Sequence, residues 1–152
     1  MNNLNLMIGD WVSYNNEFIK VNGIIRNYPF DFFPKADVIV KDDDFSCFIN
    51  IDVIQPIPLT PDLMDRIPSI TLNENRGTRY SFLDGYYNLD IDNGIVCKFD
   101  DDGTLDIYTY EYYHERFQLI CSIKYLHQLQ QLIRLLTGKE IEVKWHSQVE
   151  KI

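Results

Sequence analysis

Few residues of this chain have side chains of the kind that performs chemistry. His127 lies in a helical pattern beside glutamines, whereas a catalytic histidine needs a nucleophile or an acid within hydrogen-bond reach. The sequence has no G-x-S-x-G motif and no cysteine next to an activating base. The pattern therefore favours a structural His127 that hydrogen-bonds a neighbouring strand. It predicts that the protein is not an enzyme, with an enzyme of unrecognised type as an alternative.

Two acidic turns, at 90–94 (DIDNG) and 100–103 (DDDG), are similar to calcium-binding loops. With Gly103 in the sixth position of such a loop, Lys98 would fill the first ligand position, and Thr109 the twelfth, where Glu is required. Hairpin turns explain both segments better. The cysteines and histidines lack the paired spacing of a zinc site, and no glycine-rich phosphate loop occurs. We therefore expect no metal and no cofactor.

The strongest candidate for binding is the segment 28–35, YPFDFFPK, in which four aromatic residues stand between and beside two prolines: Tyr28, Phe30, Phe32 and Phe33. Such a loop is costly to expose to water. It either folds back between the two halves of the chain or presents stiff aromatic anchors to a partner. The sequence leaves both interpretations open.

A second candidate surface is the alternating tyrosine row that contains Tyr108 and Tyr110 and continues to Tyr112. In a strand, alternate residues share one face, so these rings would lie side by side. The row could bind a partner. It could also pack between the two halves or make ordinary cross-strand pairs.

Composition restricts the class of partner. The chain has 152 residues, is 45% hydrophobic and has a formal net charge of −9, so it is globular and repels nucleic-acid phosphates and anionic lipids. We therefore expect a protein partner, without direct nucleic-acid binding. The three widely spaced cysteines, with no secretory leader and no long apolar run, predict a cytoplasmic protein that does not enter a membrane. Oligomeric state stays open.

The elements that would position these candidates begin with a β-rich first part. Short alternating runs occupy 8–14, 17–25, 37–40 and 45–51, with Asn15-Asn16 as a turn signal. Gly23 fits a bend or bulge, and two prolines close the region at 56 and 58. We predict an SH3-like β-barrel in residues 1–59. Residues 60–79 would form a short helix, started by Thr60-Pro61 and ended before Pro68, and a linker.

Residues 80–152 predict an antiparallel four-stranded meander, at 86–92, 95–99, 104–110 and 117–122, with Asn93-Gly94 as one hairpin turn. Its apolar face would carry Leu89, Ile91, Ile95, Cys97, Phe99, Leu105, Ile107, Phe117, Leu119 and Cys121. A helix from about Ile123 to Gly138 would cover this face with Ile123, Leu126, Leu129, Leu132, Ile133, Leu135 and Leu136. A short edge strand follows at 140–144. The fold class is thus α+β and mostly β.

Two segments, DVIQPIPLT at 52–60 and IKYLHQLQQLIRLLTGKEIEV at 123–143, carry a resemblance. The chain resembles small uncharacterised proteins of Bacteroides-type bacteria, their phages and their mobile elements. The region MDRIPSITLN departs from that pattern, which has a Gly-Phe pair after the short helix. The resemblance implies an origin and an architecture, and it implies no activity.

Together these features predict a non-enzymatic binding or adaptor protein of phage or mobile-element origin. The main alternative is a phage counter-defence protein. Such a protein would inhibit a host enzyme through its acidic surface, or would sequester a nucleotide signal against tyrosine and lysine side chains.

Overall fold

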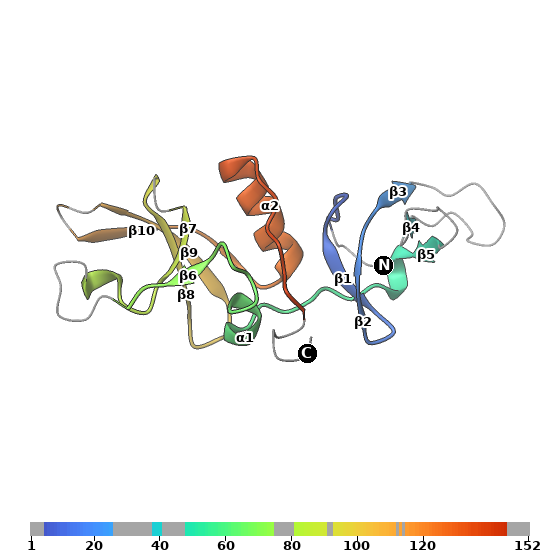
Figure 1. Cartoon of the computed structure of the whole chain (residues 1–152), viewed down its shortest axis with the longest axis horizontal. Helices are drawn as coiled ribbons and strands as arrows, with labels where there is room; N and C mark the ends of the chain where they lie inside the picture. The colour runs from blue at the N-terminus through green and yellow to red at the C-terminus, as the bar shows by residue number, and fades with distance from the viewer. Residues whose placement is uncertain are drawn as a thin grey trace, which may run out of the picture. The chain divides into compact units, whose positions relative to one another are not determined.

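The computed structural model describes residues 5–25, 38–40, 48–74, 81–90, 93–111, 113 and 115–145. In this part of the chain the fold is α+β and mostly β, with antiparallel sheets and one main helix (Figure 1). This confirms the predicted class. The contacts divide the chain into two compact units: residues 1–58 with 125–131, and residues 59–124 with 132–152. The division into 1–59, 60–79 and 80–152 stays a prediction.

The first unit contains two small sheets. Strands β1 (Trp11–Tyr14) and β2 (Glu17–Lys20) form a hairpin. Its turn residues Asn15 and Asn16 have φ values of 50° and 63°, the left-handed pair that a tight hairpin requires. Strands β3 (Gly23–Ile25), β4 (Val38–Val40) and β5 (Phe48–Asn50) form the second sheet in the order β3-β4-β5.

The core of this unit consists of aliphatic side chains from both sheets and from the segments before, between and after them: Leu6, Val12, Ile19, Val21, Ile39, Ile49, Ile51 and Ile54. The segment after them begins with the 3₁₀ turn η1 (Ile51–Val53). Gln55 then pairs with Ser13 of β1 through two backbone hydrogen bonds of 2.8 and 2.9 Å. The strands of the described residues do not close into a barrel, so the SH3-like barrel is not confirmed and stays a prediction.

The second unit begins with the helix α1 (Pro61–Met64), which the sequence predicts. The Thr60 hydroxyl accepts a hydrogen bond from the Leu63 backbone N–H at 3.2 Å and so caps the first turn. Asp62 in that turn complements the helix dipole.

A five-stranded antiparallel sheet follows, in the order β10-β9-β8-β7-β6 (Figure 1). Its strands are β6 (Thr71–Leu72), β7 (Tyr87–Asp90), β8 (Ile95–Phe99), β9 (Leu105–Glu111) and β10 (Arg116–Ile123), and the 3₁₀ turn η2 (Ser81–Leu83) lies between β6 and β7. The four strands of the predicted meander are present. The fifth, β6, was missed because two residues are too short to show an alternating pattern.

A β-bulge in β10 corrects the predicted assignment of residues to the two sheet faces. Leu119 pairs with Tyr108, whereas Cys121 pairs with Ile107, so one extra residue lies between them. Cys121 therefore lies on the apolar face, as expected, but Phe117 and Leu119 lie on the opposite face with the tyrosines. Strict alternation along β10 led to the error, because a bulge reverses the faces of all residues beyond it.

The main helix, α2 (Leu126–Thr137), begins at Leu126, whereas Ile123 still belongs to β10. Leu126, Leu129 and Ile133 are buried as predicted, but Leu135 is 84% exposed and does not widen the apolar stripe. Residues of α2 as far as Gln131 belong to the first unit, and the rest of the helix belongs to the second unit, which contains the meander.

The chain after α2 runs through Gly138, whose φ of +72° fits the left-handed end of a helix. The predicted edge strand at 140–144 is not a strand. Ile141 and Val143 are buried, and the Lys144 N–H donates to the Arg66 carbonyl at 2.8 Å. Apolar alternation here reflects packing beside α1 and not sheet pairing.

Candidate functional site

The most distinctive surface of the described residues is a group of five aromatic rings in the second unit. We call it the aromatic face, and it consists of Phe82, Tyr86, Tyr108, Tyr110 and Phe117. All five side chains are half-buried. Phe117 lies at the centre, stacked on Tyr86 at 4.7 Å between ring centroids with an interplanar angle of 6°. Tyr108 and Phe82 each lie 6.0 Å from Phe117, and Phe82 also contacts the ring of Tyr110 edge-on.

The strand register explains how these rings come together. Phe117 of β10 is directly opposite Tyr110 of β9, on the side of the bulge where both point to the same face. Tyr86 immediately precedes β7 and lies edge-on to Tyr108 at 6.0 Å. The contacts thus join side chains from η2, from the start of β7, from β9 and from β10, and they cross most of the sheet.

Charged groups border the aromatic face. The Lys98 ammonium lies 5.1 Å from the centre of the Tyr86 ring, within range of a cation–π interaction. Asp106 accepts a hydrogen bond from the Ser122 hydroxyl at 2.6 Å. The pKa of Tyr108 is raised, first by loss of solvent around the phenol and then by the negative charge of Asp106. Tyr108 is therefore a neutral hydrogen-bonding phenol at physiological pH, and no general base.

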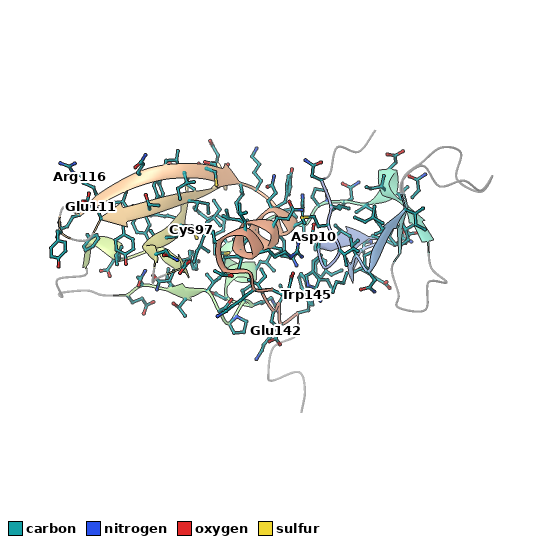
Figure 2. The ribbon with its side chains drawn as sticks, turned by 90° about the horizontal axis from the view of Figure 1, so that it is seen from above. Asp10, Cys97, Glu111, Arg116, Glu142 and Trp145 are labelled. Atoms are coloured by element: carbon teal, nitrogen blue, oxygen red, sulfur yellow. The ribbon has the colours of Figure 1, made fainter. Side chains whose placement is uncertain are left out.

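Apolar surface continues from the aromatic face onto β10. Leu119 is 54% exposed and Ile120 is 50% exposed. At the other end of the strand, a hollow of about 380 Å³ is lined by Tyr110, Phe117 and their neighbours Thr109, Glu111, Arg116 and Gln118. Glu111 and Arg116 are cross-strand partners at the end of the β9–β10 hairpin (Figure 2). In the strand register these two residues, with Thr109 and Gln118, alternate with Tyr110 and Phe117 and belong to the opposite face of the sheet.

Of the predicted binding residues, Tyr108 and Tyr110 lie in this face. Tyr28, Phe30, Phe32 and Phe33 lie outside the described residues, as does Tyr112. Sequence reasoning missed Phe82, Tyr86 and Phe117. Tyr86 lies in the predicted strand 86–92 and alternates with Leu89, so it could have been assigned to the face opposite Leu89, whereas Phe117 required knowledge of the bulge.

A second hollow, of about 320 Å³, lies beside β7 and is lined by Asn88, Asp90, Ile133 and Glu140 among others. Two of its polar side chains, Asn88 and Glu140, have partners beside the hollow. The Asn88 amide exchanges hydrogen bonds of 2.9 and 3.0 Å with Asn73, and Arg134 forms an ion pair with Glu140. These partners explain the polar lining as local structure.

In the first unit, a buried polar cluster joins α2 to the N-terminal segment. The Gln130 side chain accepts from the Trp11 N–H at 2.8 Å and donates to the Gly9 carbonyl at 3.0 Å. Asp10, which is fully buried, accepts from the Gln131 amide and from the Met7 N–H, both at 2.8 Å. Buried polar groups require such partners.

His127 belongs to the same cluster and is only 4% exposed. Its ring stacks on Tyr125, and its Nδ1 has no hydrogen-bond partner. Burial lowers the pKa of the imidazole, and the negative charge of Asp10 acts in the opposite direction. His127 is thus a neutral core residue. The expectation that it bonds a strand is wrong for Nδ1, because that atom is buried without a partner.

The remaining chemical candidates are also structural. Burial raises the pKa of the Cys97 thiol strongly, which removes its nucleophilic character at physiological pH. Asp100 uses one carboxylate oxygen to accept from the N–H groups of Asp102 and Thr104, so it closes its own turn. Within the described ranges, no three His, Cys, Asp or Glu side chains gather as metal ligands.

Comparison with known proteins adds no relative: no family model, no curated protein and no solved structure matches this chain. Among the helices of the described residues, none has the length and apolar character needed to cross a membrane.

Proposed function

We propose that this is a non-enzymatic binding protein that holds a segment of a partner protein on its aromatic face. The observation that carries the proposal is the contact network of five half-buried rings on one side of the sheet, continuous with exposed Leu119 and Ile120. Rings that support one another are held in place before binding, so little side-chain entropy is lost when a partner covers them. Aromatic residues of this kind dominate the energetics of protein interfaces.

The net charge of the chain restricts the kind of partner that the aromatic face would bind. The net charge of −9 favours association with a basic segment and opposes nucleic acid. Free thiols at Cys97 and Cys121 support a reducing compartment, such as the cytoplasm. The origin from a phage or mobile element rests on the resemblance of the PIPLT and HQLQ…LTG segments. If the basic partner is a host enzyme, the same face would serve counter-defence.

The test uses a surface-display library of random peptides, selected against the purified full chain. Enriched peptides are titrated by calorimetry against wild type, Tyr110→Ser and Tyr108→Ser. We expect basic, apolar peptides that bind each variant about tenfold or more weakly, because single anchor residues carry this much binding energy. Tyr113→Ser is the matched control, since Tyr113 is 90% exposed.

Two results would contradict the proposal: no enrichment of any peptide, or peptides that bind wild type and both tyrosine variants equally. Circular dichroism of each variant must show the wild-type spectrum, which separates loss of binding from loss of fold.

A nucleotide ligand is the second candidate, favoured by the position of Lys98 beside the Tyr86 ring. A base could stack on an aromatic ring while the ammonium approaches a phosphate. Calorimetric titration with mononucleotides and dinucleotides tests it. Binding that Lys98→Ala abolishes would favour this candidate over the peptide, and heat changes at the level of buffer would exclude it.

A further inference from the structure

The two edges of the five-stranded sheet differ in how they are protected. Strand β6 at one edge has only two residues. Strand β10 at the other edge has eight, and among the described residues only β9 pairs with it (Figure 1). Its free stretch ends at Ile123, because the next carbonyl, of Lys124, accepts from the Leu59 N–H. Short edge strands resist pairing with other chains, whereas long ones invite it.

The sequence of β10 has no charged residue or proline in its middle that would prevent another strand from pairing with this edge. Proteins usually protect long edge strands with charges or prolines in their middle. Every residue from Phe117 to Ile123 is uncharged, and none is proline. Leu119 and Ile120, at the centre, are about half exposed, at 54% and 50%. The bulge is the one protective device that the strand contains.

The bulge also restricts the registers in which the strand can pair antiparallel with a second copy of itself. In antiparallel pairing, opposite residues must point to the same face of the sheet. When a regular strand pairs with a second copy of itself across a two-fold axis, this rule allows only registers in which opposed residues are an even number of positions apart in the sequence. In β10 the bulge changes the alternation at its centre, so Phe117 and Ser122 share the aromatic face. Gln118 and Cys121 share the other face.

One register satisfies this rule for the three opposed pairs whose faces the pairing with β9 defines, 116 with 123, 117 with 122 and 118 with 121. It places Phe117 opposite Ser122 of the second copy, and Gln118 opposite its Cys121. A shift by one residue in either direction pairs Phe117 with Ile123 or with Cys121, which point to the apolar face. Such a shift would bring apolar-face side chains to the wrong side of the sheet.

Charge favours the same register. Just beyond the paired stretch it brings Glu115 toward Lys124 of the second copy at both ends, so opposite charges approach each other. The shift that pairs Phe117 with Ile123 would bring Arg116 toward Lys124, and like charges in that position repel. Leu119 faces Ile120 of the second copy at the centre, which covers the two exposed aliphatic side chains.

We propose that β10 pairs antiparallel with β10 of a second copy of this chain. The two sheets then form one continuous sheet, and the two aromatic faces meet across the two-fold axis. Strand pairing buries less surface than stable dimers need, about 1,000 Å², so the dimer is in reversible equilibrium with the monomer. The dimer does not depend on the proposed partner of the aromatic face.

Sedimentation velocity of the full chain over two decades of concentration tests the dimer. Wild type is expected to shift from monomer to dimer, with dissociation in the micromolar range. Leu119→Lys places a charge at the centre of the pairing and should weaken the dimer about tenfold or more. Leu135→Lys, at a residue of α2 that is 84% exposed, is the matched control and should leave dissociation unchanged.

Charge exchange tests the register. Lys124→Glu and Glu115→Lys should each weaken the dimer, and the double variant should restore it. A thiol introduced by Gln118→Cys lies opposite Cys121 of the second copy, so mild oxidation should give a covalent dimer. Adding Cys121→Ser should abolish that dimer.

A chain that stays monomeric at every concentration would overturn the proposal. So would a dimer that is indifferent to Leu119→Lys, or one that the double charge variant fails to restore. Peptide binding is measured separately at concentrations where the chain is monomeric, so failure of the dimer leaves the proposed function independently testable.

Discussion

The buried polar cluster around Gln130 and the aromatic face of the β-sheet are opposite solutions to the placement of unusual side chains. In the cluster, polar groups lie inside the first unit, and internal partners accept or donate most of their hydrogen bonds. In the aromatic face, large apolar rings lie on the surface of the second unit, supported by one another but only half covered. The first arrangement satisfies most of its own hydrogen bonds. The second leaves apolar area exposed.

The difference shows which residues are candidates for function. The buried polar cluster contains a histidine, an aspartate and two glutamines, which are residue types that often bind ligands or take part in catalysis. Here Asp10, Gln130 and Gln131 join a helix to the N-terminal segment, and His127 is buried beside them. The tyrosines and phenylalanines, which are ordinary core residues by type, are the ones that stay accessible. Residue type alone therefore does not show which of the two regions is exposed to a partner.

The largest expected effect comes from removing the centre of the cluster. Gln130→Ala removes the side chain that pairs with the partly buried Trp11 N–H and Gly9 carbonyl. Two such groups left without a partner cost about 3 kcal/mol of the free energy of unfolding. Urea denaturation measures the loss. Gln55→Ala, at an exposed glutamine of the same unit, should change stability by less than about 0.5 kcal/mol. Equal effects of both variants would show that the cluster is not what joins the helix to the N-terminal segment.

A substitution in the aromatic face is expected to lower the free energy of unfolding by a smaller amount. Tyr86→Ala removes a stacked ring, an edge-on contact and the cation–π contact with Lys98. Because the ring is half exposed, we expect a loss of about 2 kcal/mol. Tyr113→Ala is the matched control, with an expected change below about 0.5 kcal/mol. If Tyr86→Ala destabilised the chain more than Gln130→Ala, the aromatic face would be part of the core and not a surface prepared for binding.

The smallest effect is the dependence of stability on pH through His127. Its pKa in the folded chain is below the ordinary value of 6.5, so the folded state binds the proton less readily than the unfolded state. Stability from this group is complete above pH 6.5 and falls as the pH decreases below it. Urea midpoints measured between pH 7.5 and 5 should decrease for wild type, and less for His127→Gln. A decrease of equal slope in both would assign the effect to other groups.

The candidate site could be predicted from the sequence only in part. Alternation along 104–110 correctly placed Tyr108 and Tyr110 on one face. The central ring, Phe117, was assigned to the wrong face because the bulge between Leu119 and Cys121 leaves no mark in the pattern of apolar residues. Phe82 lies in a short 3₁₀ turn, where no periodicity exists to predict its direction.

Local chemistry in the sequence determined the order of the four meander strands, the cap at Thr60 and the end of α2 at Gly138. Each of these depends on neighbouring residues: a hairpin turn, a hydroxyl before a proline, a residue that accepts positive φ. Only the tertiary structure decided which residues of α2 bind the N-terminal segment and which rings meet on the sheet. Those contacts join residues such as Gly9 and Gln130 that are far apart in the chain, and one extra residue in β10 reverses which side chains face each other. The pattern of side chains along the sequence indicates whether a segment is a helix or a strand. It does not indicate which residues of two neighbouring elements lie opposite each other.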